Sequence, residues 1–180
     1  MARAERAMTL DEVNRLGSDA FVAAFGGIAE HTPWVAERAM ASRPFQSRGA
    51  MVDAFQTAVA TASRPEQHAL IAAHPDLAGR AAIAGALGED SRHEQKGAGL
   101  DTLTPDEFQR FTRLNDAYRA RFGFPFILAV KGATKHQIIE AFERRIHGAM
   151  EEEFWTAIAQ VMRIIRFRIE DRVGDDTRRD

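Results

Sequence analysis

A histidine next to a proline is the first candidate for chemistry in this chain. His74 precedes Pro75, and a proline ring disfavours the α conformation of the residue before it, so the preceding helix is predicted to end at His74. A histidine side chain titrates near neutral pH and can donate or accept a proton. At a helix C-terminus it can also be purely structural, because the negative end of the helix dipole stabilises the imidazolium. The same dipole suits a general acid, so the structural role and a role in proton transfer are compatible, and both stay open at this point.

A polar cluster follows in residues 88–101, a stretch rich in glycine that is predicted to be a loop. The cluster consists of Ser91, Arg92, His93, Glu94 and Gln95. Such a run is often only a solvated surface. A metal site would use His74, His93 and Glu94, but their spacing matches no compact ligand motif such as His-Glu-x-x-His, so no metal is expected.

Arg145 is the third candidate, on a predicted helix that has an apolar face. An arginine on such a helix is normally solvated. If it points into a pocket, its guanidinium can bind a carboxylate through two parallel hydrogen bonds.

Helix signals dominate the elements that must position these residues. Capping patterns at Thr9, Thr104 and Thr134 each place Glu or Gln three residues later. The last long helix is predicted over about residues 151–172, and the small-residue segment 77–87 is also predicted to be helical. We therefore predict an all-α fold, a compact single-domain bundle of about seven to ten helices.

One segment interrupts the helical pattern. A short apolar run near residues 124–130 contains Pro125 and is predicted to be extended and buried. The single domain is predicted to span residues 1–180, with its core over about 10–173.

The composition of the 180 residues narrows the classes of partner and compartment. The net charge of −2 and the pI of about 6.3 give no electrostatic reason to expect nucleic acid or an anionic membrane. No apolar run is long enough to span a bilayer. The chain has no cysteine, which excludes disulfides and thiolate chemistry and fits a reducing compartment. We expect a cytoplasmic protein.

Taken together, these segments resemble the 2-oxo-4-hydroxy-4-carboxy-5-ureidoimidazoline (OHCU) decarboxylase family, which completes urate oxidation to (S)-allantoin. The resemblance runs from about Leu10 to Val173 and is specific as a set of motifs. They are Glu30 to Ala36, Arg43-Pro44-Phe45, His74-Pro75-Asp76-Leu77-Ala78-Gly79-Arg80, Ser91 to Gln95, Leu114-Asn115 with Tyr118, and Phe122-Gly123-Phe124-Pro125-Phe126-Ile127.

The resemblance implies an all-helical fold, no cofactor, a small-molecule ureidoimidazoline substrate and a homodimer. It implies that His74 is the catalytic histidine. Arg145 matches a helical Arg-Leu position of the family, although Ile146 follows it here. The remaining substrate-contacting positions implied by the resemblance are Pro75, Ser91, Arg92, His93, Gln95, Phe126, Ile127, Leu128, Ala129 and Val130.

The family's chemistry explains these residue types. The substrate carries a carboxylate and a hydroxyl on one ring carbon, next to an imine-like carbon that can accept the electron pair left by CO₂. Neither pyridoxal nor a metal is then required. The protein must orient the carboxylate and deliver a proton to one face. We assign this proton transfer to His74, and we expect Glu94 to orient His74 or to bind the ureido or hydroxyl group.

Two other functions compete with this hypothesis. The chain could be a non-catalytic helical binding subunit of a purine-catabolic complex, which would tolerate changes at His74 and Glu94. It could also be a metal-dependent hydrolase of a ureido compound, which elemental analysis and chelators would reveal.

Overall fold

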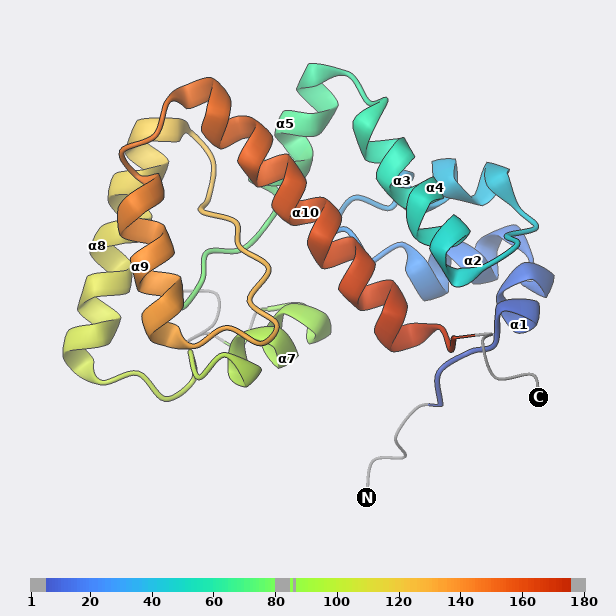
Figure 1. Cartoon of the computed structure of the whole chain (residues 1–180), viewed down its shortest axis with the longest axis horizontal. Helices are drawn as coiled ribbons and strands as arrows, with labels where there is room; N and C mark the ends of the chain where they lie inside the picture. Colours follow the sequence, from blue (N-terminus) through green and yellow to red (C-terminus); the bar gives the residue numbers. More distant parts are fainter. Residues whose placement is uncertain (1–5, 80–84, 86, 176–180) are drawn as a thin grey trace. The chain divides into compact units, whose positions relative to one another are not determined.

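The computed structural model describes residues 6–79, Gly85 and 87–175 (Figure 1). These ranges contain nine α-helices and one 3₁₀ helix. Apart from an isolated bridge between Met8 and Val173, their regular structure is helical, which confirms the all-α prediction. None of the helices in the described ranges is both long and apolar enough to cross a membrane.

The chain divides into two compact units. One contains the residues up to Ser63 together with those from Met162 onward, and the other is Arg64–Val161. The prediction of a single domain over residues 1–180 stays a prediction.

The first unit is built around a core of packed phenylalanines. The ring of Phe21 lies 5.0 Å from Phe25 and 6.2 Å from Phe55, measured between centroids. The helices of this unit are α1 (Leu10–Arg15), α2 (Ser18–Phe25), α3 (Trp34–Ala39), η1 (Met40–Ser42), α4 (Arg48–Ala60) and the end of α10 (Met150–Arg172).

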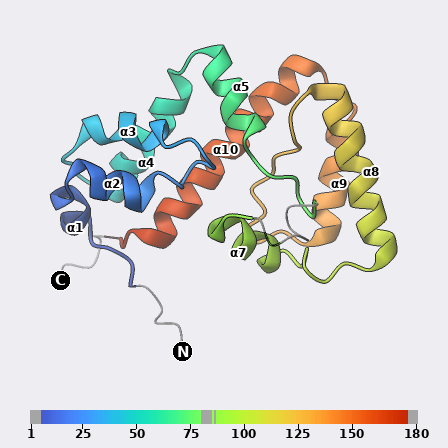
Figure 2. The ribbon, with the colours of Figure 1, turned by 180° about the vertical axis from the view of Figure 1, so that it is seen from behind.

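The second unit contains every candidate residue. Its helices are α5 (Arg64–Ala72), α7 (Glu89–Gly97), α8 (Pro105–Phe122), α9 (Lys135–Arg145) and the first part of α10. Capping boxes at Thr104 and Thr134 start α8 and α9 as predicted. These two helices lie side by side in both views (Figures 1 and 2).

The apolar segment, residues 124–130, follows α8 and is neither helix nor strand. Gly123 ends α8 with φ 77°, a left-handed conformation that glycine adopts without steric cost. Every residue of the apolar segment is buried except Leu128, which is half-buried. The prediction that this segment is buried and interrupts the helices is confirmed, and its extended conformation stays a prediction.

The prediction of a loop over residues 88–101 is wrong, because Glu89–Gly97 forms α7. The helix buries Ser91, Gln95 and the adjacent Ala98, which lie at helical spacing. Since two of these three side chains are polar, the stretch lacks the apolar periodicity that normally reveals a helix.

Most of the segment 77–87, which was predicted to be helical, lies outside the described residues. Its first residues are described and do not form a helix: Leu77 and Ala78 lie in a turn.

Candidate active site

His74 lies just after the last turn of α5, where the sequence predicted the helix to end. Its side chain is buried, and its Nδ1 lies 3.0 Å from the carbonyl oxygen of Leu70. A carbonyl oxygen only accepts, so Nδ1 carries the proton in this contact. In the neutral ring the lone pair is then on Nε2. His74 thus satisfies a carbonyl of the last helical turn and presents Nε2 as the nitrogen that can take or give a proton.

The His74 turn, residues His74–Gly79, is fastened by amide side chains from two helices. Gln95 of α7 accepts from the Ala78 N–H at 3.0 Å and donates to the Asp76 carbonyl at 3.4 Å. Asn115 of α8 donates to the Leu77 carbonyl at 2.9 Å. Ala78 has φ 51°, which is unusual for a residue with a Cβ, and the bond from its N–H to Gln95 helps to hold it there.

An ion pair at the surface adds a third attachment to the His74 turn. Nε of Arg119 lies 2.8 Å from Oδ1 of Asp76. Gly79 closes the turn so tightly that a Cβ at this position would lie 2.6 Å from the Cβ of Asp76. The sequence motif His-Pro-Asp-Leu-Ala-Gly therefore specifies a tight turn as well as a histidine.

The polar cluster on α7 is divided between the interior and the surface. Ser91 and Gln95 are buried, Glu94 is half-buried, and Arg92 and His93 are exposed. The structure therefore brings Gln95 to the His74 turn. Arg92 donates to the nearby Leu87 carbonyl at 3.0 Å. No three histidine, aspartate or glutamate side chains in the described part of the chain are arranged to hold a metal ion.

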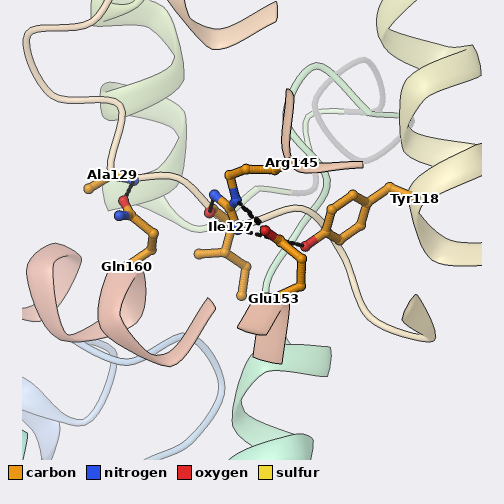
Figure 3. Close-up of polar contacts among 6 residues, drawn as sticks. All are labelled: Tyr118, Ile127, Ala129, Arg145, Glu153 and Gln160. Carbon is orange, nitrogen blue, oxygen red and sulfur yellow. Dashed lines mark hydrogen bonds and ion pairs between the residues drawn. The ribbon is translucent and has the colours of Figure 1, made fainter. Parts of the chain in front are cut away.

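Arg145 is half-buried, with its side chain 10% exposed, and it binds partners within the chain. Its Nε lies 3.1 Å from Oε2 of Glu153, and its Nη2 lies 3.0 Å from the same oxygen (Figure 3). Its Nη1 donates to the Ile127 carbonyl at 2.7 Å. The guanidinium also lies 4.4 Å from the centre of the Phe126 ring. The carboxylate that Arg145 binds in this structure is thus that of Glu153, and Arg145 fastens the apolar segment.

Tyr118 completes this buried cluster from α8. Its hydroxyl donates to Oε2 of Glu153, the oxygen that also accepts from Arg145 (Figure 3). Burial, and then the hydrogen bond to Glu153, raises the pKa of the Tyr118 phenol above its ordinary value of 10.0. The phenol therefore stays protonated and remains a donor at neutral pH.

Gln160 of α10 makes a second attachment to the apolar segment. Its Oε1 accepts from the Ala129 N–H at 2.9 Å (Figure 3). Side chains from α9 and α10 therefore bind the backbone on both sides of Leu128, at the Ile127 carbonyl and at the Ala129 N–H.

Reasoning from the sequence missed Glu153 and Gln160. Glu153 follows two other glutamates in the first turn of α10, where an acidic run is normally solvated. The spacing of these two residues could nevertheless have indicated that they share one face of the helix. Glu153 and Gln160 are separated by two helical turns and share the side of α10 that carries the buried Ala157.

The comparisons with known proteins agree on one family. The family model described as OHCU decarboxylase matches residues 14–170. The OHCU decarboxylase of Haloferax volcanii is 46% identical over 169 residues, covering 94% of this chain and 98% of the relative. The mouse enzyme of the same name is 35% identical, covering 93% of this chain and 94% of the relative.

Solved structures give the same result. A crystal structure of (S)-allantoin synthase aligns with a TM-score of 0.75 and 30% identity, covering 93% of this chain. This chain spans 54% of that solved chain. A structure of OHCU decarboxylase in the presence of (S)-allantoin has a TM-score of 0.65, covers 86% of this chain and 96% of its own, and at 18% identity supports the fold alone. With the family model matched over nearly the whole chain and relatives of full length, the protein belongs to the OHCU decarboxylase family.

Proposed function

We propose that this protein decarboxylates 2-oxo-4-hydroxy-4-carboxy-5-ureidoimidazoline to (S)-allantoin, with His74 as the proton-transferring residue. Family membership supports the reaction. The observation that supports the role of His74 is the contact of its buried Nδ1 with the Leu70 carbonyl, and from this contact we infer that Nε2 transfers the proton.

The reaction proceeds in two steps. The bond between the ring carbon and the carboxylate breaks, which releases CO₂, and its electron pair forms a double bond to the neighbouring carbon. The C=N electrons move to the ring nitrogen, which takes a proton from water. The resulting enol then loses its hydroxyl proton and receives a proton on the carbon that bears the ureido group. Delivery to one face makes the product one-handed. In this proposal His74 takes the hydroxyl proton and supplies the proton on carbon.

The other predicted site residues are part of the proposal. Glu94, half-buried on α7, orients His74 or binds the ureido or hydroxyl group. The substrate also contacts Pro75, the α7 cluster and the apolar segment. Arg145 acts on the substrate through the apolar segment, because its guanidinium is bound to Glu153 and to the Ile127 carbonyl.

The decisive experiment compares His74→Ala with His136→Ala, a control at an exposed histidine on α9. Loss of general acid–base help lowers the rate by about 10²–10⁴-fold, so His74→Ala should lose at least about a hundredfold in kcat. Circular dichroism of fresh product should show (S)-allantoin with wild type and His136→Ala, and racemic allantoin from uncatalysed decay with His74→Ala. Wild-type kcat and one-handed product from His74→Ala would refute the assignment.

A second test addresses the tautomer directly. Nitrogen chemical shifts of the His74 ring should report a proton on Nδ1 in the neutral form. A neutral ring protonated on Nε2 would contradict the proposed base.

We also propose a cytoplasmic homodimer that needs no cofactor. The resemblance and the electron sink within the substrate support this proposal. Light scattering should give twice the chain mass, and a chelator should leave activity unchanged.

A further inference from the structure

We propose that Gln160 and Arg145 are positioning residues, which set the backbone around Leu128 so that its N–H and carbonyl can bind the substrate as a pair. The inference deepens the proposed function and rests on it. It concerns the backbone of Leu128, the half-buried residue of the apolar segment.

In the apolar segment, backbone groups that bind side chains of α9 and α10 flank a residue whose backbone groups do not. In an extended backbone, the carbonyl of one residue and the N–H two residues later point to the same edge, and the N–H and carbonyl of the residue between them point to the other. Arg145 binds the Ile127 carbonyl and Gln160 binds the Ala129 N–H. In the extended conformation that the sequence predicts for this segment, the two helices bind one edge, and the Leu128 groups lie on the opposite edge.

Leu128 differs from its neighbours in two ways. It is the half-buried residue in a segment that is otherwise buried. No residue in the described part of the chain makes a hydrogen bond to its N–H or its carbonyl. Backbone groups with little access to water are nearly always paired, so a ligand or ordered water is expected there.

The chemistry of this edge favours one class of ligand group. A donor and an acceptor side by side match a group that carries a carbonyl and an N–H together, which is the edge of a urea or of a lactam ring. The substrate carries both, in its ureido group and in its ring. A carboxylate, which accepts only, would satisfy the Leu128 N–H and leave its carbonyl unpaired.

The positioning residues also tune these two groups. The Ile127 carbonyl and the Leu128 N–H belong to one peptide unit, so the Arg145 cation on that carbonyl makes the N–H a stronger donor. The Leu128 carbonyl and the Ala129 N–H belong to the next unit, so Gln160 makes that carbonyl a stronger acceptor. Glu153 neutralises Arg145, and Tyr118 holds the same Glu153 oxygen, so the guanidinium stays in place.

The test replaces Gln160 with Met, which has similar length and no acceptor for the Ala129 N–H. Gln160→Glu keeps the acceptor oxygen and serves as the conservative rescue. Gln56→Met is the matched control, because Gln56 is also half-buried and its amide donates to the Met162 carbonyl in the first unit. Both Met variants lose one bond between a side-chain amide and the backbone, so both should unfold at similar denaturant concentrations.

We expect Gln160→Met to raise KM about tenfold with little change in kcat, as loss of one well-formed substrate hydrogen bond would do. Gln160→Glu and Gln56→Met should stay close to the wild-type KM. A wild-type KM in Gln160→Met would overturn the positioning role. If His74→Ala is inactive in the same assays, the proposed function still stands.

A binding measurement that does not depend on catalysis separates the positioning role from the proposed function. On titration with (S)-allantoin, the amide proton resonance of Leu128 should shift in the wild type, and the shift should be weaker at the same concentration in Gln160→Met. A shift in a protein that proves to have no decarboxylase activity would support the positioning role and refute the proposed function. An unmoved Leu128 amide under saturating (S)-allantoin would refute the positioning role.

Discussion

Two non-helical segments of the second unit are held in place by different kinds of chemistry. The His74 turn is fastened by the neutral amides of Gln95 and Asn115, with an ion pair between Arg119 and Asp76 at the surface. The apolar segment is fastened by a buried ion pair, Arg145 with Glu153, and by Gln160. A buried charge must keep its partner, whereas an amide can be lost at lower cost.

The difference suits the parts that the two segments play in the proposed function. The His74 turn carries a group that must change its protonation state in the proposed reaction, and the side chains that hold it inside the protein are neutral amides. The apolar segment offers only backbone groups, and a neighbouring cation strengthens their polarity. If the contrast is right, substitutions in the two segments should differ in how much stability they remove.

Removing Glu153 should produce the largest loss. Glu153→Ala leaves the Arg145 guanidinium, whose side chain is only 10% exposed, without its carboxylate, and breaking a largely buried pair in this way costs about 3–5 kcal/mol of unfolding free energy. Chemical denaturation measures this loss of unfolding free energy. Glu151→Ala is the control, because Glu151 lies one half-turn away and pairs with Arg64 at the surface, so only a small loss is expected. Equal losses in the two variants would contradict the buried pair.

Removing Gln95 should have an intermediate effect. Gln95→Leu leaves the Ala78 N–H without its acceptor, and an unsatisfied buried group costs about 1–3 kcal/mol. Because the turn holds His74, kcat should also fall. Lys96→Ala, at the exposed neighbouring position, should change neither quantity. Gln95→Leu with wild-type stability and kcat would show that Gln95 does not hold the His74 turn.

Neutralising Asp76 should have a small effect that depends on salt. Its carboxylate pairs with Arg119, whose side chain is 43% exposed. Such pairs contribute about 0–1 kcal/mol and are screened by salt. The difference in unfolding free energy between wild type and Asp76→Asn should shrink from low to high ionic strength. A gap that is large and independent of salt would mean that Asp76 is held by something other than this ion pair.

Ionisation of Tyr118 should have no effect near neutral pH and a growing one in strong alkali. Its pKa is raised in the folded protein, so its contribution to stability is complete below the ordinary value of 10.0 and is lost as pH rises above it. Tyr118 is the sole tyrosine of the chain, so phenolate absorbance reports this residue alone. Titration at the ordinary value in the folded protein would contradict its burial against Glu153. Tyr118→Phe should abolish this alkaline component of unfolding.

The sequence predicted the helices well where their signals are local. Thr104 and Glu107 form a capping box within one turn, and the structure has it. The same holds for the end of α5 at His74-Pro75. The helix α7 escaped prediction because its buried face is partly polar: Ser91 and Gln95 occupy positions where periodicity analysis looks for apolar residues.

The candidate site was predictable only in part. The sequence selected His74 and the apolar segment, and it selected Arg145 as a potential clamp. It could not show that Arg145 binds Glu153, because that choice depends on α9 and α10 coming together. Nor could it separate Leu128 from its equally apolar neighbours in residues 124–130, since the difference lies in which backbone groups the helices reach.

The capped starts of α8 and α9, the buried apolar segment and the histidine at the end of α5 could therefore be predicted from the sequence. These features follow from contacts between residues a few positions apart, such as caps, pre-proline sterics and hydrophobic spacing. The partners of Arg145, Gln95 and Gln160 could be identified only in the folded protein. Each of these side chains has several donors or acceptors that water would satisfy equally well, and its choice is made when packing removes the water and leaves one protein group within reach.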